Sequence, residues 1–128
     1  MMAEGAGAEV TVVNRYALRD AGAFEASITA LVARVRDEGN PGVLAYRFFR
    51  AGPDQARAVV RYESPEAWVG HHDLIMGWPE MAAQRAAADL LEIELFGPMT
   101  AAMQDWIDRM GLGERLRHRG EAFAGFQR

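Results

Sequence analysis

Apolar and polar residues alternate in four short stretches of the chain, and each stretch predicts a β-strand. The stretches span residues 10–18, 43–50, 57–63 and 90–96. A period of two sends successive side chains to opposite faces of a sheet. A turn at residues 51–55 joins the second and third strands into a hairpin. On the first strand one face would carry Val10, Val12, Asn14, Tyr16 and Leu18.

Three longer stretches repeat apolar residues every three or four positions, which predicts amphipathic helices. The first begins after Asp20, a good N-cap, and aligns Phe24, Ile28, Leu31, Val32 and Val35. The second begins at Ser64 and Pro65, a cap followed by a residue suited to the first helical turn. It breaks at Trp78-Pro79 and continues as an alanine-rich segment over residues 80–88. The third covers residues 99–110, and a last short helix and then an ordered or loose arm would follow from Gly111.

The resulting order, β-α-β-β-α-β, predicts an α+β protein of the ferredoxin-like, split β-α-β class. Four antiparallel strands would form one sheet with the helices on a single face. The 128 residues suffice for one domain. We expect residues 1–9 to be a flexible N-terminus, residues 10–97 to form the ferredoxin-like unit, and residues 98–128 to be a helical extension of the same domain.

The sheet face without helices has a mixed character. It would carry Val13, Val43, Val59 and Phe49 among Arg15, Arg47, Arg61, Glu92 and Glu94. Such a face is rather apolar for exposure to water, which predicts a homodimer formed through the non-helical sheet face. The alternative is a solvated face with a few apolar residues.

Composition excludes several functions. A net charge of −4 argues against a nucleic-acid partner. No apolar run approaches a membrane span and no secretory signal is visible, so we expect a cytoplasmic protein. The chain has no cysteine, and all 14 of its Lys and Arg residues are arginines. This excludes thiolate chemistry, disulfides, Schiff-base lysines and P-loop lysines.

His71 is the main candidate for chemistry. It lies near the middle of the apolar side of the helix that begins at Pro65, while His72 lies toward its edge. Adjacent histidines diverge around a helix, so we expect no metal site from them. The alternative for His71 is a core histidine bonded to a tyrosine hydroxyl or a backbone carbonyl.

Several other polar or aromatic residues converge on the helix-facing side of the sheet. They are Asn14, Tyr16, Tyr46 and Tyr62 from the strands, with Trp68 and Trp78 from the helical region. Polar groups in an apolar cavity orient a ligand, and aromatic rings offer stacking surface, so we expect a small aromatic ligand. The alternative is ordinary packing of the tyrosines and tryptophans in the core.

Gly42, Tyr46 and the run Glu66-Ala67-Trp68-Val69-Gly70-His71 resemble the "G…Y…E-A-x-x-x-H" pattern of the antibiotic biosynthesis monooxygenase family. The resemblance covers about residues 10–97 and implies a dimeric α/β barrel with a pocket between sheet and helices. Arg61 and Glu63 stand where many members carry Glu and Trp.

The resemblance also implies a cofactor-independent monooxygenase acting on a small aromatic, polyketide-like or quinol substrate. His71 would be the base, and Tyr46, Tyr62 or Asn14 would stabilise the developing oxyanion. One alternative is a dimeric protein that binds a small aromatic ligand without catalysis. Another is haem degradation, for which Asn14 resembles one element, although Met81 appears near the position of the axial histidine.

Overall fold

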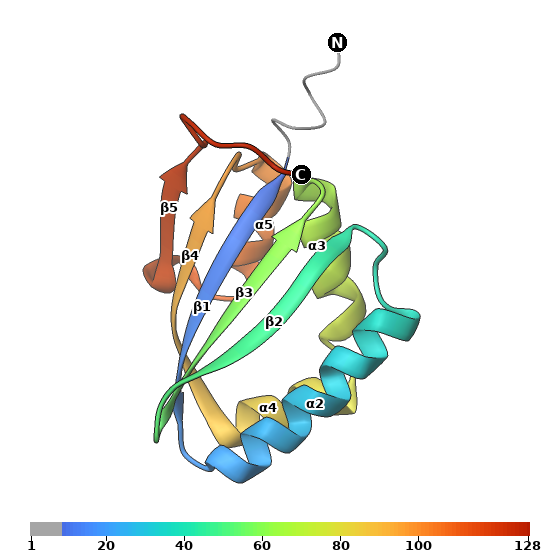
Figure 1. Ribbon diagram of the computed structural model, residues 1–128, viewed down its shortest axis with the longest axis vertical. Coiled ribbons are helices and arrows are strands. Elements are labelled where there is room, and N and C mark those ends of the chain that lie inside the picture. The colour runs from blue at the N-terminus through green and yellow to red at the C-terminus, as the bar shows by residue number, and fades with distance from the viewer. Residues whose placement is uncertain (1–8) are drawn as a thin grey trace.

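The computed structural model describes residues 9–128, so the prediction for residues 1–9 falls almost entirely outside the described residues. Figure 1 shows the helices and strands of the chain. In chain order the elements are β1 (Val10–Leu18), α2 (Ala21–Glu38), β2 (Val43–Gly52), β3 (Gln55–Tyr62), α3 (Pro65–Ile75), α4 (Pro79–Ala87), β4 (Ala88–Phe96), α5 (Ala101–Arg109), the 3₁₀ turn η1 (Gly113–Arg115) and β5 (Leu116–Gly120). The predicted α+β class and its element order are confirmed.

The sheet has the strand order β2-β3-β1-β4-β5. Strands β1 to β4 pair antiparallel, as the ferredoxin-like prediction requires. The fifth strand was not predicted: β5 pairs parallel to β4, with Leu116 beside Ile93. Where a last short helix and then an arm were predicted from Gly111, the structure has the single turn η1 followed by β5. A five-residue strand with one large apolar residue has no hydrophobic alternation that sequence reasoning could detect.

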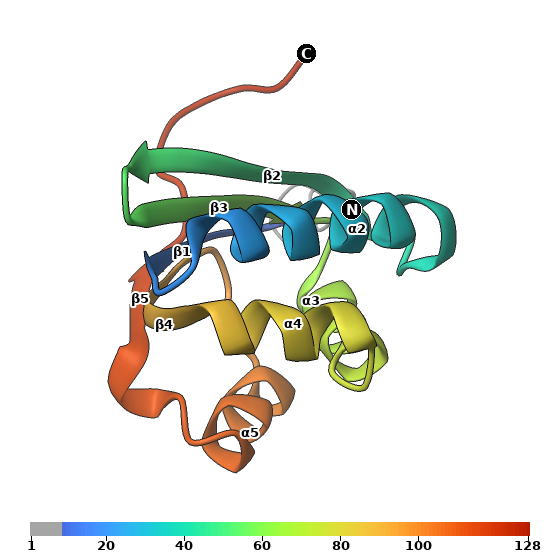
Figure 2. The ribbon, with the colours of Figure 1, turned by 90° about the horizontal axis from the view of Figure 1, so that it is seen from below.

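The helices lie on one face of the sheet and leave the other face open (Figure 2). Residues after β5 run back toward β3, where the Arg61 guanidinium donates to the Gln127 side-chain oxygen at 2.8 Å. Arg61 points to the open face, because its neighbours Val60 and Tyr62 are buried under the helices. The chain therefore ends on the open side of the sheet.

Side-chain caps begin the helices where the sequence predicted them. The Asp20 carboxylate accepts from the Ala23 amide at 3.0 Å, and the Ser64 hydroxyl accepts from the Ala67 amide at 3.1 Å. Each cap satisfies an amide that has no partner within its helix. Pro65 occupies the first position of α3, where its missing amide hydrogen costs nothing.

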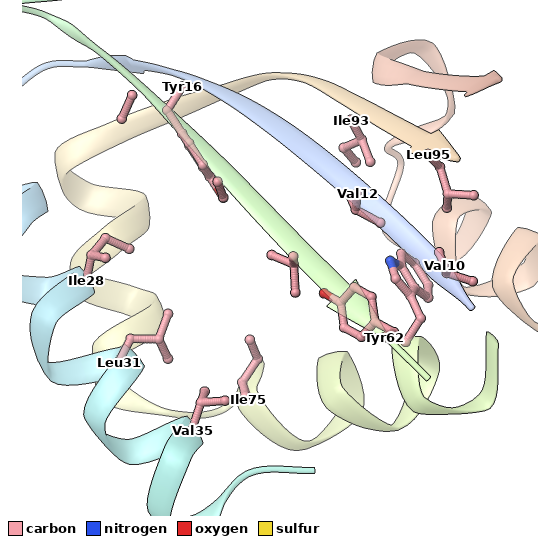
Figure 3. Packing of buried hydrophobic residues seen from close by; sticks show 14 of the residues in the cluster. Val10, Val12, Tyr16, Ile28, Leu31, Val35, Tyr62, Ile75, Ile93 and Leu95 are labelled. Atoms are coloured by element: carbon pink, nitrogen blue, oxygen red, sulfur yellow. The ribbon is translucent and has the colours of Figure 1, made fainter. Parts of the chain in front are cut away.

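The core lies between the sheet and the helices (Figure 3). Side chains of α2 meet the inward residues of the strands, and the buried residues labelled in the figure are Val10, Val12, Tyr16, Ile28, Leu31, Val35, Tyr62, Ile75, Ile93 and Leu95. Two irregularities in strand register interrupt the predicted alternation. A shift between Val43 and Ala45 turns Val43 toward the core and leaves Leu44 46% exposed. A shift after Arg15 inserts Leu91 as an extra residue between Leu90 and Glu92, which pair with β1, and Leu91 is 43% exposed.

Two glycines allow α3 to approach the loop before β2. A Cβ on Gly42 would lie 2.5 Å from the Ala67 Cβ, and one on Gly70 would lie 2.6 Å from the Asn40 amide nitrogen. The Asn40 side-chain oxygen accepts from the Gly42 amide at 2.8 Å, which fixes the turn. Both glycines belong to the motif that carries the family resemblance, and here they serve packing.

No helix among residues 9–128 is long and apolar enough to cross a bilayer.

Candidate functional site

A cavity of about 680 Å³ lies between the sheet and helices α3, α4 and α5. Its volume falls within the range typical of small-molecule sites. The wall is mostly apolar and aromatic, with few polar side chains. The lining residues are Val12, Asn14, Tyr16, Trp68, His72, Met76, Met81, Gln84, Arg85, Ala88, Asp89, Leu90, Leu91, Ile93, Trp106, Met110, Leu112 and Arg115.

His72 is the histidine that lines this cavity. Its Nδ1 lies 2.7 Å from the backbone carbonyl oxygen of Trp68, one helical turn earlier. A carbonyl oxygen can only accept, so Nδ1 must carry the hydrogen and Nε2 keeps its lone pair. Burial lowers the pKa of His72 to about 4, against the opposing influences of the Trp68 carbonyl and the Asp73 charge. The ring is therefore neutral at pH 7.

Two tryptophans enclose His72. The centroid of the His72 ring lies 4.3 Å from the Trp68 ring centroid and 5.0 Å from that of Trp106. The two indoles meet edge to face at 5.3 Å. The Trp106 indole nitrogen donates to the Asp73 carboxylate at 3.0 Å, which attaches α5 to α3. One wall of the cavity thus comes from the C-terminal extension.

His71 lies on a different side of α3 from His72 and does not line the cavity. It is 1% exposed, and its ring centroid lies 5.3 Å from that of Tyr46 and 5.6 Å from that of Tyr62. Among the described residues its Nδ1 has no hydrogen-bond partner. Burial, reinforced by the neighbouring His72, lowers the pKa of His71 to about 3. The predicted position in the core is confirmed, whereas its role as the base stays a prediction.

The polar part of the cavity wall centres on Tyr16. Its hydroxyl accepts from the Asn14 amide at 3.5 Å and from the Gln84 amide at 3.4 Å, two long contacts. Burial raises the pKa of Tyr16 to about 12, although both amides oppose the shift, so the phenol keeps its proton. The Asn14 side-chain oxygen and the Trp68 indole nitrogen are buried without a partner among residues 9–128. The cavity wall thus contains two residues with an unpaired buried group, an acceptor on Asn14 and a donor on Trp68.

The structure brings three of the six predicted ligand-contacting residues to the cavity: Asn14, Tyr16 and Trp68. Tyr46 and Tyr62 lie beside His71 instead, where burial raises the pKa of each phenol. Trp78 does not line the cavity. Its ring lies 4.0 Å below the Arg34 guanidinium, which also pairs with Glu80 at 3.1 Å.

Sequence reasoning missed the contributions of α4, α5 and η1, namely Gln84, Arg85, Trp106 and Arg115. The apolar stripe that includes Trp106 predicted a helix but could not show what the helix would cover. No three His, Cys, Asp or Glu side chains of the described chain gather as metal ligands would.

No protein-family model and no curated protein sequence matches the chain. Solved structures do. The chain is similar to MupZ from Pseudomonas fluorescens, with a TM-score of 0.74 and 18% identity over 94% of this chain and 95% of that one. It is also similar to SnoaB, a cofactor-independent oxygenase from Streptomyces nogalater, with a TM-score of 0.62 and 21% identity over 73% of this chain and 96% of that one.

A putative antibiotic biosynthesis monooxygenase from Caulobacter crescentus CB15 gives a TM-score of 0.61 and 22% identity, over 73% of this chain and 92% of that one. Because the match with MupZ covers 94% of the chain, it must include most of the C-terminal extension. At these identities the similarity concerns the fold. The family resemblance found in the sequence is confirmed at that level: the chain has the fold of the antibiotic biosynthesis monooxygenases.

Proposed function

We propose that the protein binds a flat aromatic molecule in the 680 Å³ cavity and oxygenates it with dioxygen, without a metal or an organic cofactor. The observation that carries the proposal is His72, a neutral imidazole in the cavity wall whose Nδ1 is held by the Trp68 carbonyl. Its free Nε2 is the basic nitrogen in that wall.

The chemistry begins with removal of a proton from an acidic C–H or phenolic O–H of the substrate by Nε2 of His72. The resulting electron-rich anion passes electrons to dioxygen, and a carbon–oxygen bond forms to give a hydroperoxide. Loss of water then converts a ring methylene into a carbonyl. One oxygen atom stays in the product and the other leaves as water, so the substrate itself is the reductant.

The unpaired buried groups suit this substrate. The Trp68 indole nitrogen can donate to an oxygen that gains charge, and the Asn14 side-chain oxygen can accept from a neighbouring hydroxyl. The low pKa of His72 keeps the base unprotonated above about pH 4. The printed description of SnoaB as a cofactor-independent oxygenase also supports the proposal, through the shared fold.

The test is oxygen consumption with anthrones, naphthols and quinols. His72→Ala should lower the rate by about 10²–10⁴-fold, while binding of the unreactive ligand anthraquinone changes little. His71→Gln should retain activity if it only packs in the core, and the same assay tests its predicted role as the base. His118→Gln, whose ring bonds to the Gly97 carbonyl outside the cavity, is the matched control.

Equal rates for His72→Ala and the unaltered protein would show that His72 is not the base. Binding of anthraquinone without oxygen consumption for any substrate would favour the alternative of a non-catalytic binding protein. A Soret band that shifts when haem is added would favour the haem alternative.

A further inference from the structure

Two arginines flank one end of the cavity. Arg85 comes from the last turn of α4, and Arg115 ends the turn η1. Both line the cavity, and neither forms an ion pair with a described carboxylate. Most other arginines of the described chain pair with a carboxylate, and the whole chain carries a net charge of −4.

The Arg115 side chain is held in place. Its Nε donates to the Leu90 carbonyl oxygen at 2.9 Å, and Leu90 also lines the cavity. The bond leaves both terminal nitrogens of the guanidinium without a partner among residues 9–128. A guanidinium positioned by its Nε loses less freedom when its remaining N–H groups bind an anion.

The single carboxylate of the cavity wall cannot neutralise these arginines. It belongs to Asp89, which already pairs with the Arg19 guanidinium. Arg19 does not line the cavity, and its second terminal nitrogen donates to the Arg85 carbonyl oxygen at 2.6 Å. The end of the cavity near Ala88 and Leu90 therefore has a positive balance.

The positive end lies away from His72, whose ring centroid is 6.2 Å from that of Tyr62, the residue paired with Val10 at the other end of β1. Leu90 is paired with Tyr16 on β1, whereas Leu95 beyond the cavity is paired with Val12. Val12 to Tyr16 spans about 13 Å of strand, close to the length of three fused aromatic rings.

We propose that the ligand of this cavity is an aromatic acid, whose carboxylate binds Arg85 and Arg115 while its ring system extends toward His72. This inference rests on the ligand-binding part of the proposed function and names its substrate class. It does not depend on the oxygenation step. Arg115 belongs to the extension, so the extension contributes acid recognition as well as a wall.

The test compares two unreactive probes of nearly equal size: anthraquinone-2-carboxylate and the neutral anthraquinone-2-carboxamide. Binding is measured by quenching of tryptophan fluorescence, since Trp68 and Trp106 line the cavity. The carboxylate should bind roughly tenfold more tightly, the size of effect expected for charge-assisted hydrogen bonds. High salt should reduce this preference, because the two arginines are exposed.

Arg85→Gln and Arg115→Gln should each weaken binding of the carboxylate by about three- to tenfold and leave the carboxamide unchanged. Arg109→Gln, an exposed arginine of α5 outside the cavity, is the control and should change neither. Arg115→Lys separates charge from geometry, because lysine keeps the charge but loses the fixed fork.

Equal affinity for both probes, or a loss in the variants that is the same for both, would overturn the inference. If the inference fails in this way but the protein consumes oxygen with neutral substrates, the oxygenase proposal still stands. Preference for the carboxylate without any oxygen consumption would support the inference and remove the oxygenase. If neither probe binds, both proposals are wrong.

Discussion

His71 and His72 are neighbours in the sequence, but α3 places them in different surroundings. His71 is sealed among the tyrosines of β2 and β3, and His72 borders the cavity. Burial lowers the pKa of both rings, so each is neutral in the folded protein where an exposed histidine would begin to take up a proton. Lowering the pH should therefore reduce the free energy of unfolding through these two residues.

We expect the free energy of unfolding to fall as the pH drops from about 6.5 toward 4. The folded-state pKa of His71 is about 3, below its ordinary value of 6.5. Between these two values the unfolded chain binds a proton at His71 and the folded chain does not. Each such histidine contributes a slope of about 1.4 kcal/mol per pH unit in this window. Urea unfolding at several pH values measures it.

His71→Gln should be the more informative variant, because glutamine does not titrate. Its stability curve should be flatter than that of the unaltered protein between pH 6.5 and 4, while any cost of altered packing appears equally at pH 8. Parallel curves for the two proteins would mean that His71 is protonated in the folded state.

Single residues show how far the sequence could predict the site. The helical period of 3.6 placed His71 in the core, and the strand period of two placed Asn14 and Tyr16 on the inward face. Neither period could show that the cavity opens beside His72, because that depends on α5, whose docking is set by the contact of Trp106 with Asp73. Contacts between distant segments carry no local signal.

At the scale of elements, the close approach of α3 to the loop before β2 depends on Gly70. Gly70→Ala should destabilise the protein by about 1–3 kcal/mol, because the new methyl group displaces the Asn40 side chain that binds the Gly42 amide. Gly77→Ala is the matched control, since its Cβ would meet nothing within 4 Å. Equal stability of the two variants would contradict this reading of the motif glycine.

The attachment of α5 to α3 makes a second prediction. Asp73→Ala leaves the Trp106 indole nitrogen without its acceptor and should cost about 1–3 kcal/mol of stability. Asp73→Asn retains an acceptor oxygen and should restore part of that loss. Asp105→Ala, an exposed carboxylate on α5, should stay within about 0.5 kcal/mol of the unaltered protein. Thermal unfolding and anthraquinone affinity, measured together, would show whether the helix also shapes the cavity.

Elements with strong local patterns were predictable and elements held by pairing were not. Capping by Asp20 and Ser64 placed two helix starts. The shift at Val43–Ala45 moved Leu44 out of the core, and the shift after Arg15 inserted Leu91 as an extra residue, because a bulge adds a residue without any change in composition. β5 is held by backbone pairing with β4 and by the ion pair of Arg119 with Glu94 at 2.8 Å.

At the scale of the whole molecule, the open sheet face is the surface to explain. Phe49 is 50% exposed there, while Arg15 pairs with Glu92 at 3.6 Å and Arg61 with Glu9 at 2.7 Å. Charges that are already paired within one chain can enter an interface at lower cost than free ones. We propose that two copies associate through this face, as the sequence pattern predicted.

A charge placed at the middle of this face should dissociate such a dimer. Val59→Glu should reduce the mass in solution from twice the 14.1 kDa of one chain to a single chain, because it would bury an unpaired carboxylate in the interface. Ala83→Glu, an exposed position on α4, should leave the mass unchanged. Sedimentation equilibrium measures both. A single-chain mass for the unaltered protein would show that the face is solvated.

The fifth strand also bears on aggregation. Without it, β4 would end the sheet with unsatisfied amide and carbonyl groups from Ile93 to the exposed Phe96, a template on which foreign strands could grow. β5 occupies that template and presents Arg117 and Arg119 in its place. The guanidinium groups of Arg117 and Arg119 pair with Glu92 and Glu94, so the new edge carries paired charges in place of apolar side chains, and we expect it to be a poorer template for foreign strands.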